Sequence, residues 1–453
     1  MKKSLVALFL ALSLLLTMLT VPAMAEEKPA GWNNVNAEGY VYPDYTGEKI
    51  RFMWWGGDAR AKITTEVIEL YEKLTGLEIE YEFYDGGTYW TVFQAYQAGK
   101  TLPDVFQMGG NWLTYYDTIE PLNKYIESGI IDTTAISPAM IATTVNMANG
   151  DVTGISNGTN ARCFAYNPAL FDEAGVPYPT ANWTWDDFAK ACRAITAKTG
   201  NPAVTTLEYN SLVWSVVTQW KEGYNFFSMD GTSFDFEGDI APFTYIFDLL
   251  TTLQKEGCIA DYGIQNEIGG NIEADWIAYG DAAIVMLTSN QFQALSAVAA
   301  ESGITLDLCT IPRVYPDGQS GMVVRSSQQL SLYSGSEKKE IAANFMNFFA
   351  NSIEANKILN CERGVSVNSD VLAALREVSD PVNAKVYAVI DLIGSFPDAA
   401  NSSPAEPACA EELRDVLKST YLQGLAEGKF ESAQDAAEKF WAEAQVIWDK
   451  YAE

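Results

Sequence analysis

The sequence predicts an α/β protein that begins with a mostly parallel sheet. Three apolar segments are typical of strands, namely Ile50 to Trp55, Leu77 to Phe83 and Pro103 to Met108. The stretches between these segments carry apolar residues at helical spacing. An order of strand, helix, strand, helix, strand implies parallel strands joined by right-handed crossovers.

The first crossover is predicted to be a helix that ends at Gly76. Ile63, Val67 and Leu74 recur at the spacing of one helix face, and glycine is common just past a helix end. In the following segment, 77–83, apolar residues alternate strictly with three glutamates. This alternation indicates a half-buried strand at or near the edge of the sheet.

The middle of the chain predicts a second group of strands and helices. Residues 154–195 are typical of a strand, a tight turn, a short helix, a proline-rich loop and a helix capped near Thr184. A further helix is expected between residues 234 and 257. Residues 273–295 predict a helix, a buried strand with a polar end and another helix. Residues 302–333 predict two long strands around a Pro/Gly loop.

Two further helical regions complete the pattern. A helix is expected over residues 89–98, ending at Gly99, and the C-terminal tail is expected to be helical. The last helix of the tail has an apolar face at helical spacing. That face consists of Ala437, Phe440, Trp441, Ala444, Trp448 and Tyr451.

The composition excludes several classes of function. A chain of 453 residues is long enough for two or three domains, and its net charge of −30 argues against nucleic acid or an anionic membrane surface as a partner. The absence of histidine excludes Ser-His-Asp sites, Cys-His sites and histidine-ligated metals. We therefore expect no metal and no cofactor.

The cysteines give no sign of a metal or redox motif. No two of the six are close enough in sequence to form a C-x-x-C pair. Their even number permits disulfides, but isolated cysteines with apolar neighbours are more often buried thiols. The six are Cys163, Cys192, Cys258, Cys309, Cys361 and Cys409.

The N-terminus is typical of a secretory signal peptide. Lys2 and Lys3 precede a long apolar run that ends in Ala23-Met24-Ala25, so residues 1–25 are expected to be removed after Ala25. An uncleaved anchor is the alternative. The first cysteine is Cys163, which leaves no lipobox cysteine for lipid attachment. Residues 26–47 are polar and predict a linker or an extended arm. The expected location is extracytoplasmic, in the periplasm or at the cell surface.

Two strand ends of the predicted parallel sheet carry the same unusual chemistry. The segments "WWGGDAR" (54–60) and "GGNWLTYY" (109–116) each combine paired glycines, tryptophan and polar side chains. Ligands of open α/β sheets bind at the carboxyl ends of the strands, and glycines let the backbone approach a ligand closely. The sequence therefore predicts a ligand site at this edge.

Several longer segments resemble one known family. "YNPALFDEAGVPYPTANWTWDDFAKA" (166–191), "GDAAIVM" (280–286), "KKEIAANFMNFFANSIEANKILN" (338–360) and "ERGVSVN" (362–368) are similar to blocks of the extracellular solute-binding proteins of ABC importers. The resemblance is to the carbohydrate-binding group that includes maltose-binding protein. The segment 54–60 is most similar to members that take up plant cell-wall oligosaccharides, including pectin-derived ones.

The resemblance implies two α/β lobes, a hinge of crossing strands and a sugar held in the cleft between the lobes. The crossings would lie near residues 160–165 and 310–325. One lobe would comprise residues 48–160 and 318–368, and the other residues 161–317 and 369–453. The implied protein is a monomer and not an enzyme. It binds an oligosaccharide and delivers it to the membrane permease subunits of an importer.

A sugar site needs aromatic faces for the C–H side of the ring, and charged or amide groups for the hydroxyls. At most one of the two adjacent tryptophans should face the ligand from its strand, because successive side chains point to opposite faces. The candidate ligand-binding residues are Trp54, Trp55, Asp58, Arg60, Asn111, Trp112, Asn160, Arg162, Trp214, Asn290, Phe292, Arg325 and Arg363.

The same residues allow other interpretations. Asp58 and Arg60 would equally fit a salt bridge within a loop, and Trp112 would equally cap a core. Arginines at four predicted cleft or hinge positions would suit a uronic acid, but arginine also binds the hydroxyls of neutral sugars. A secreted glycosidase or lyase, or a sugar-binding surface or sensor protein, remains the alternative function, although nothing in the sequence marks a catalytic carboxylate pair.

Overall fold

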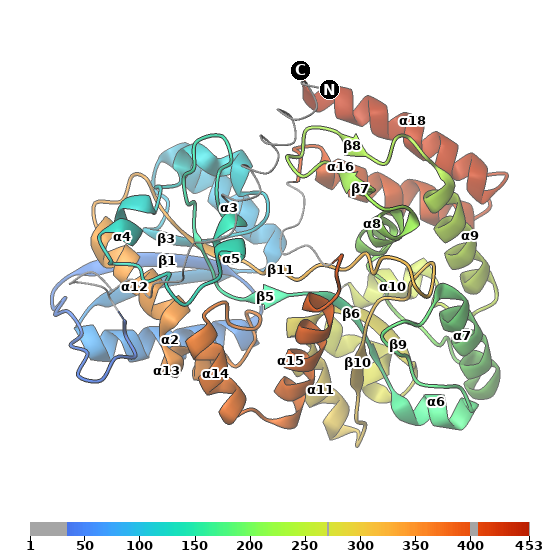
Figure 1. Ribbon diagram of the computed structural model, residues 1–453, viewed down its shortest axis with the longest axis horizontal. Helices are drawn as coiled ribbons and strands as arrows, with labels where there is room; N and C mark the ends of the chain where they lie inside the picture. The colour runs from blue at the N-terminus through green and yellow to red at the C-terminus, as the bar shows by residue number, and fades with distance from the viewer. Residues whose placement is uncertain (1–33, 270, 399–405, 453) are drawn as a thin grey trace, which may run out of the picture.

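The protein folds into two α/β lobes joined by extended crossing segments (Figure 1). The structure is a computed structural model that describes residues 34–269, 271–398 and 406–452. The expected signal peptide, residues 1–25, lies outside the described residues. The two-lobed α/β fold expected from the sequence is confirmed.

The first lobe is built on a five-stranded sheet in the order β2-β1-β3-β12-β4. The first three strands are parallel, as predicted, whereas β12 runs antiparallel to both β3 and β4. The strands are β1 (Lys49–Trp55), β2 (Glu78–Tyr84), β3 (Val105–Met108), β4 (Ile155–Ser156) and β12 (Gln329–Leu332).

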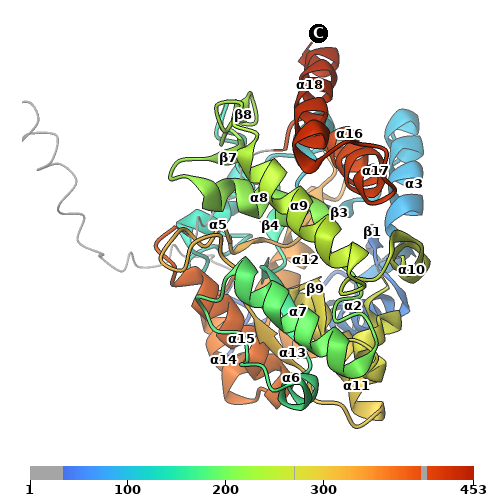
Figure 2. The same cartoon turned by 90° about the vertical axis from the view of Figure 1, so that its right-hand side faces the viewer.

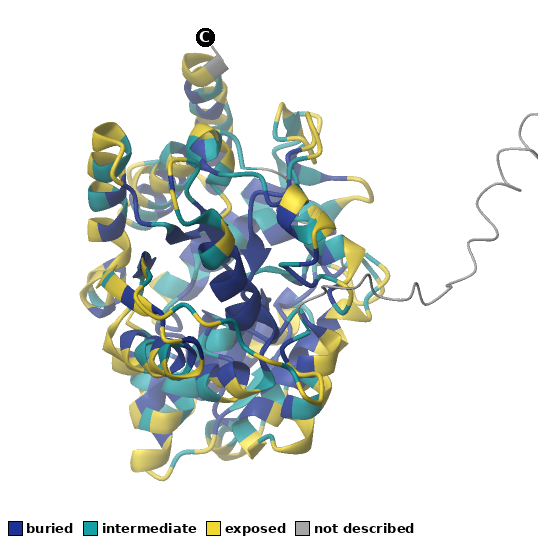
Figure 3. Ribbon diagram, turned by 90° about the vertical axis from the view of Figure 1, so that its left-hand side faces the viewer, coloured by how far each residue is buried: buried dark blue, intermediate teal, exposed yellow. Residues whose placement is uncertain are grey.

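Helices cover both faces of this sheet. One core joins the β1 side chains of Phe52 and Trp54 to Val67 and Phe345, and a second core joins Met53 on the other face to α3. Figure 3 shows the buried residues gathered at the centre of the view and the exposed ones around the outside. The helices are α2 (Asp58–Thr75), α3 (Gly86–Gly99), α12 (Lys339–Asn351) and α13 (Ile353–Leu359).

The helix α2 ends at Gly76 as predicted, but it begins earlier than the sequence suggested. Asp58 and Arg60 lie in its first turn, not in a loop. The residues before β1 lie along the first lobe. Tyr42 and Tyr45 pack against its core, and Asn36 donates a hydrogen bond to the Asn351 carbonyl at 2.7 Å.

The second lobe contains a three-stranded antiparallel sheet in the order β10-β6-β9, surrounded by helices (Figure 2). The strands are β6 (Arg162–Tyr166), β9 (Ile284–Thr288) and β10 (Asp307–Cys309). The main helices are α6 (Pro168–Ala174), α7 (Trp185–Thr199), α8 (Tyr209–Trp220), α9 (Ala241–Lys255), α11 (Phe292–Glu301), α14 (Ser369–Glu377), α15 (Pro381–Gly394), α16 (Ala410–Asp415) and α18 (Ala433–Ala452).

Three sequence predictions for this lobe are confirmed. Thr184 and Asp187 form the capping box of α7. The predicted face of the last helix is buried at Ala437, Phe440 and Ala444, its two tryptophans pack against the same core, and only Tyr451 is exposed. All six cysteines are buried and unpaired, as the apolar surroundings indicated.

The prediction of two long strands over residues 302–333 is wrong. Three short strands occur there, because residues 310–324 run over α8 instead of pairing with a strand. The Gln219 amide donates to the carbonyls of Pro312 and Ser320 at 2.9 and 2.8 Å, and so takes the place of a strand partner. Met322 and Val324 pack in the core of the second lobe. Residues 318–324, which were expected in the first lobe, therefore lie with the second.

The crossing segments pair with one another between the lobes (Figure 1). The strand β5 (Thr159–Asn160) runs antiparallel to β11 (Arg325–Ser326), and Thr159 also bridges to Val365. None of the helices in the described residues is long and apolar enough to cross a bilayer.

Gly364 is expected to be required where these segments meet. Its φ is 109°, and a Cβ atom added there would lie 2.8 Å from both the Asn160 Oδ1 and the Thr159 carbonyl oxygen. A matched control is Gly200, which also has a positive φ (77°) but open space around it. Gly200→Ala should cost about 1 kcal/mol in unfolding free energy. Gly364→Ala should cost about 1–3 kcal/mol more. Equal losses in urea titrations of the two variants would contradict tight packing at Gly364.

Candidate functional site

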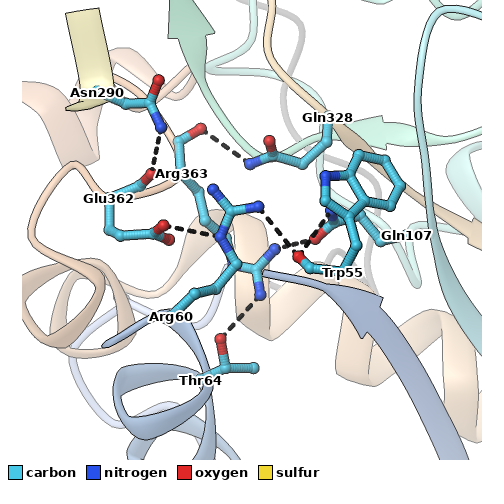
Figure 4. A network of polar contacts seen from close by, with 8 residues as sticks. All are labelled: Trp55, Arg60, Thr64, Gln107, Asn290, Gln328, Glu362 and Arg363. Atoms are coloured by element: carbon cyan, nitrogen blue, oxygen red, sulfur yellow. Dashed lines mark hydrogen bonds and ion pairs between the residues drawn. The ribbon is translucent and has the colours of Figure 1, made fainter. Parts of the chain in front are cut away.

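A buried arginine organises the junction between the lobes (Figure 4). Arg363 is 1% exposed, and its guanidinium donates to the Gln107 side-chain oxygen and to the Thr64 hydroxyl. The Arg363 carbonyl accepts from the Gln328 amide at 3.1 Å. Burial, and then the charge of nearby Arg60, lower the pKa of Arg363 to about 9. Arg363 therefore joins α2 to β3 through its side chain and holds the returning chain through its carbonyl.

A second arginine extends this network toward the second lobe. Arg60 donates through Nε to Glu362 Oε1 at 2.7 Å and through Nη1 to the Trp55 carbonyl at 3.1 Å. The Glu362 carbonyl in turn accepts from the Asn290 amide at 2.9 Å, and Asn290 follows β9 of the second lobe. Arg60 therefore forms a salt bridge from the helix α2 to the distant Glu362, not the salt bridge within a loop that the sequence allowed as an alternative.

Several predicted ligand residues are thus occupied in the hinge or in a core. Arg60, Asn290 and Arg363 belong to the hinge network, and Asn160 is buried beside it, where its side-chain oxygen accepts from Ser289 at 3.4 Å. We define the hinge network as Arg60, Thr64, Gln107, Asn290, Gln328, Glu362 and Arg363, together with the Trp55 carbonyl.

The expectation that Trp54 and Phe292 contact a ligand is corrected by their burial. Each side chain is 0% exposed. Trp54 stacks on Phe83 within the first-lobe core, and Phe292 lies in the second-lobe core. Apolar burial removes both rings from any ligand surface in this conformation.

The two predicted strand ends of the first lobe do lie together. A Cβ atom added to Gly109 would be 3.7 Å from the Trp55 ring and 3.4 Å from the Asn111 side-chain oxygen. Trp55 and Trp112 are half-buried, whereas Asp58 is exposed at the start of α2. The Trp55 ring packs against Trp90 at 5.7 Å between centroids, so this edge carries partly accessible aromatic surface.

A large concavity lies against the second lobe and the crossing strands. It has a volume of about 740 Å³, within the usual range for a small-molecule site. Of the predicted residues, Arg162, Trp214 and Arg325 line it. Trp54, Trp55, Asp58, Arg60, Asn111, Trp112, Asn160, Asn290, Phe292 and Arg363 do not.

The walls of this cavity are rich in aromatic rings. Trp214 and Trp220 come from α8, Phe226 and Phe227 come from β7 (Asn225–Phe227), and Tyr315 comes from the loop over α8. The Trp214 ring stacks on Phe226, with 4.9 Å between centroids. Polar groups between the rings would reach hydroxyls, because Ser211, Thr218 and Gln319 also line the cavity.

A smaller cavity of about 310 Å³ adjoins the first and shares Arg162 and Ser211 with it. An ion pair stands between the two, since Arg414 lines the smaller cavity and its partner Glu406 lines the larger. Arg414 also lies 4.9 Å from the centroid of the Trp214 ring. A Cβ atom added to Gly110 of the first lobe would be 3.9 Å from the Glu406 carboxyl carbon, so the first lobe borders this region.

Sequence reasoning missed several residues of this site. Tyr315 lies in a loop that was predicted to join two strands, and its proline neighbours were the only available signal. Glu406 and Arg414 come from the C-terminal tail, for which the sequence indicated only helices. Both residues are far from Arg162 in the sequence, so no local pattern indicates that they line the same cavities as Arg162.

The sequence profile described as "Bacterial extracellular solute-binding protein" matches residues 55–355. The chain belongs to this family. The resemblance inferred from the sequence blocks is therefore confirmed, and the family is one of binding proteins, not enzymes.

Among curated proteins, an arabinooligosaccharide-binding protein of Halalkalibacterium halodurans is 26% identical over 164 residues. That match covers 34% of this chain and 35% of the relative, so the chain spans about a third of the length of this curated protein.

Solved structures share the fold over nearly the whole chain. A periplasmic solute-binding protein of Pectobacterium atrosepticum is 22% identical, with a TM-score of 0.77 over 90% of this chain and 100% of that one. A periplasmic oligogalacturonide-binding protein of Yersinia enterocolitica, in complex with saturated digalacturonic acid, is 21% identical. Its TM-score is also 0.77, over 89% of this chain and 100% of that one. At such identities the likeness shows the two-lobed fold.

Replacing Arg363 should destabilise the solute-binding fold strongly. Arg363→Ala leaves the Gln107 oxygen without its donor and opens a cavity, so the free energy of unfolding should fall by about 3 kcal/mol or more. Arg193→Ala is the control, because Arg193 pairs with Glu256 on the surface and should cost no more than about 1 kcal/mol. Urea titration measures both, and a loss below about 1 kcal/mol for Arg363→Ala would contradict its structural role.

Proposed function

We propose that this protein is the extracytoplasmic substrate-binding subunit of an ABC importer for an oligosaccharide. It would capture the oligosaccharide by closure of its lobes and deliver it to membrane permease subunits. The observation that carries the proposal is the aromatic cavity beside the crossing strands of a solute-binding fold. The named relatives that bind arabino- and galacturono-oligosaccharides support the sugar class.

The chemistry of the cavity fits a sugar. Pyranose rings present C–H faces that pack on aromatic side chains, and Trp214, Trp220 and Tyr315 offer such faces within one cavity. Hydroxyl groups need donors and acceptors between those faces, which Ser211 and Thr218 supply. A longer oligosaccharide would occupy both cavities, since the smaller cavity adjoins the larger one at Arg162.

Lobe closure would bring the first lobe into the site. The accessible aromatic edge around Trp55 and Trp112 belongs to the lobe that borders Glu406, and only short crossing segments join the lobes. Hinged domains joined by few strands commonly close around ligands. Trp55, Asp58, Asn111 and Trp112 remain proposed contacts of the closed form.

Location and assembly are also proposals. We infer export by the signal sequence at residues 1–25 and a function outside the cytoplasm, which accords with the extracellular family. The proposed protein acts as a monomer that contacts the permease only on delivery. A plant cell-wall origin of the sugar rests on the resemblance of residues 54–60 and on the oligogalacturonide-binding relative.

Trp214→Ala should weaken oligosaccharide binding by about ten-fold, because one aromatic face of the cavity is lost. Calorimetric titration with a panel of arabino-, galacturono- and malto-oligosaccharides measures the affinity. Trp276→Ala is the control, since Trp276 packs against the second-lobe core and does not line the larger cavity. Melting curves of both variants separate folding from binding.

The same mixtures test the alternative of a secreted glycosidase or lyase. After a day with wild-type protein, chromatography should return the bound oligosaccharide intact. Cleavage products that depend on the protein would overturn the binding-protein proposal. So would a failure of the wild type to bind any member of the panel.

Lobe closure should reduce the radius of gyration when the bound oligosaccharide is saturating. A ligand that contacts both lobes binds the closed state more tightly than the open state, and therefore shifts the population toward the closed state. Small-angle scattering with and without the sugar identified by titration measures the change. An unchanged radius at full occupancy would contradict a hinge mechanism.

A further inference from the structure

One cation in the wall of the large cavity has no partner in the part of the chain that the structure describes. Arg325 lies on β11, and its guanidinium has no hydrogen-bond acceptor and no ion-pair partner among the residues that the structure describes. The other cations at the cavity are engaged. Lys221 pairs with Glu237, Arg162 with Glu208, and Arg414 with Glu406. An unpaired guanidinium at the wall of a cavity has donors and charge available for a ligand.

The neighbouring arginine adds a second positive charge to the cavity wall. Arg162 uses one terminal nitrogen for Glu208 and the Thr288 hydroxyl, while its buried Nε–H has no partner among the described residues. In the strand pair of β11 and β5, Arg325 lies opposite Asn160 in register, and Asn160 is two residues before Arg162. One guanidinium group thus comes from the crossing strand β11 and the other from the start of β6, and both line the same cavity.

The surroundings make this charge costly without an anion. Poor access to water, and then repulsion by Arg162, lower the pKa of Arg325 to about 10, while Glu406 and Glu208 act in the opposite direction. Those two carboxylates are already paired with Arg414 and Arg162. An additional negative group would offset both the lost hydration and the repulsion.

The remaining acids of the cavity wall do not supply that group. Asp398 accepts hydrogen bonds from the Ser320 backbone and hydroxyl and from the Gly321 backbone. Glu222 and Asp317 are exposed. The donors of Arg325 are thus left for a molecule that enters the cavity.

We propose that Arg325 binds the carboxylate of an acidic oligosaccharide, with the charge of Arg162 beside it, so that the transported sugar contains uronic acid units. The guanidinium fork matches the two oxygens of a carboxylate, which a neutral hydroxyl does not. Aromatic rings beside the pair, such as Trp214, would hold the sugar ring that carries the carboxylate. This inference rests on the proposed function and names its substrate class.

The test compares an acid with its uncharged ester. Digalacturonic acid and its dimethyl ester are titrated calorimetrically into wild-type protein, Arg325→Gln and Arg193→Gln. Arg193→Gln is the control, because it removes the same charge from a surface pair with Glu256. Melting curves verify that each variant is folded.

The wild type should bind the acid about ten-fold or more tightly than the ester. Arg325→Gln should abolish that preference while leaving the affinity for the ester within about two-fold, and Arg193→Gln should retain the preference. A preference that survives in Arg325→Gln, or a wild type that binds acid and ester equally, would overturn the inference. If Arg325→Gln fails to fold, Arg325→Lys serves instead, and an undiminished preference there would count against a bidentate pairing.

The two proposals can fail separately. Binding of neutral oligosaccharides from the panel without binding of digalacturonic acid would overturn the acidic substrate class and leave the oligosaccharide importer standing. Binding of no oligosaccharide at all would overturn both.

Discussion

The buried guanidinium of Arg363 fixes the base in the first lobe from which the crossing segments start. The guanidinium donates to Gln107 of β3 and to Thr64 of α2. The backbone carbonyl of Arg363 accepts from Gln328 in the returning chain. Acceptors for two of the three guanidinium nitrogens offset part of the cost of burying a charge that has no carboxylate partner. The crossing strands therefore start from a base that these hydrogen bonds fix.

The arginines near the crossing strands lie in two different surroundings. Arg60 and Arg363 are committed to the hinge network, so they are not available to a ligand. Arg162 and Arg325 lie farther along the crossing strands and face the cavity. The four arginines thus differ in their surroundings: Arg60 and Arg363 are enclosed in the hinge network, whereas Arg162 and Arg325 line the cavity.

The second lobe supplies most of the cavity wall because a loop and a tail are drawn across α8. The Gln219 amide holds the loop through two carbonyls, which brings Tyr315 and Met322 to the cavity. The tail adds Glu406 and Arg414 beside Trp214. A ligand there would touch segments from distant parts of the sequence, and closure of the first lobe would complete its enclosure.

The sequence by itself determined the local elements and the family. The parallel start of the sheet, the end of α2 at Gly76, the capping box of Thr184 and the buried cysteines follow from periodicity and local chemistry. Only the tertiary structure decided which polar residues are free. Arg60 and Arg325 look alike in sequence, but Glu362 reaches the first and no described residue pairs with the second. Such pairings depend on contacts between distant segments, which no local pattern records.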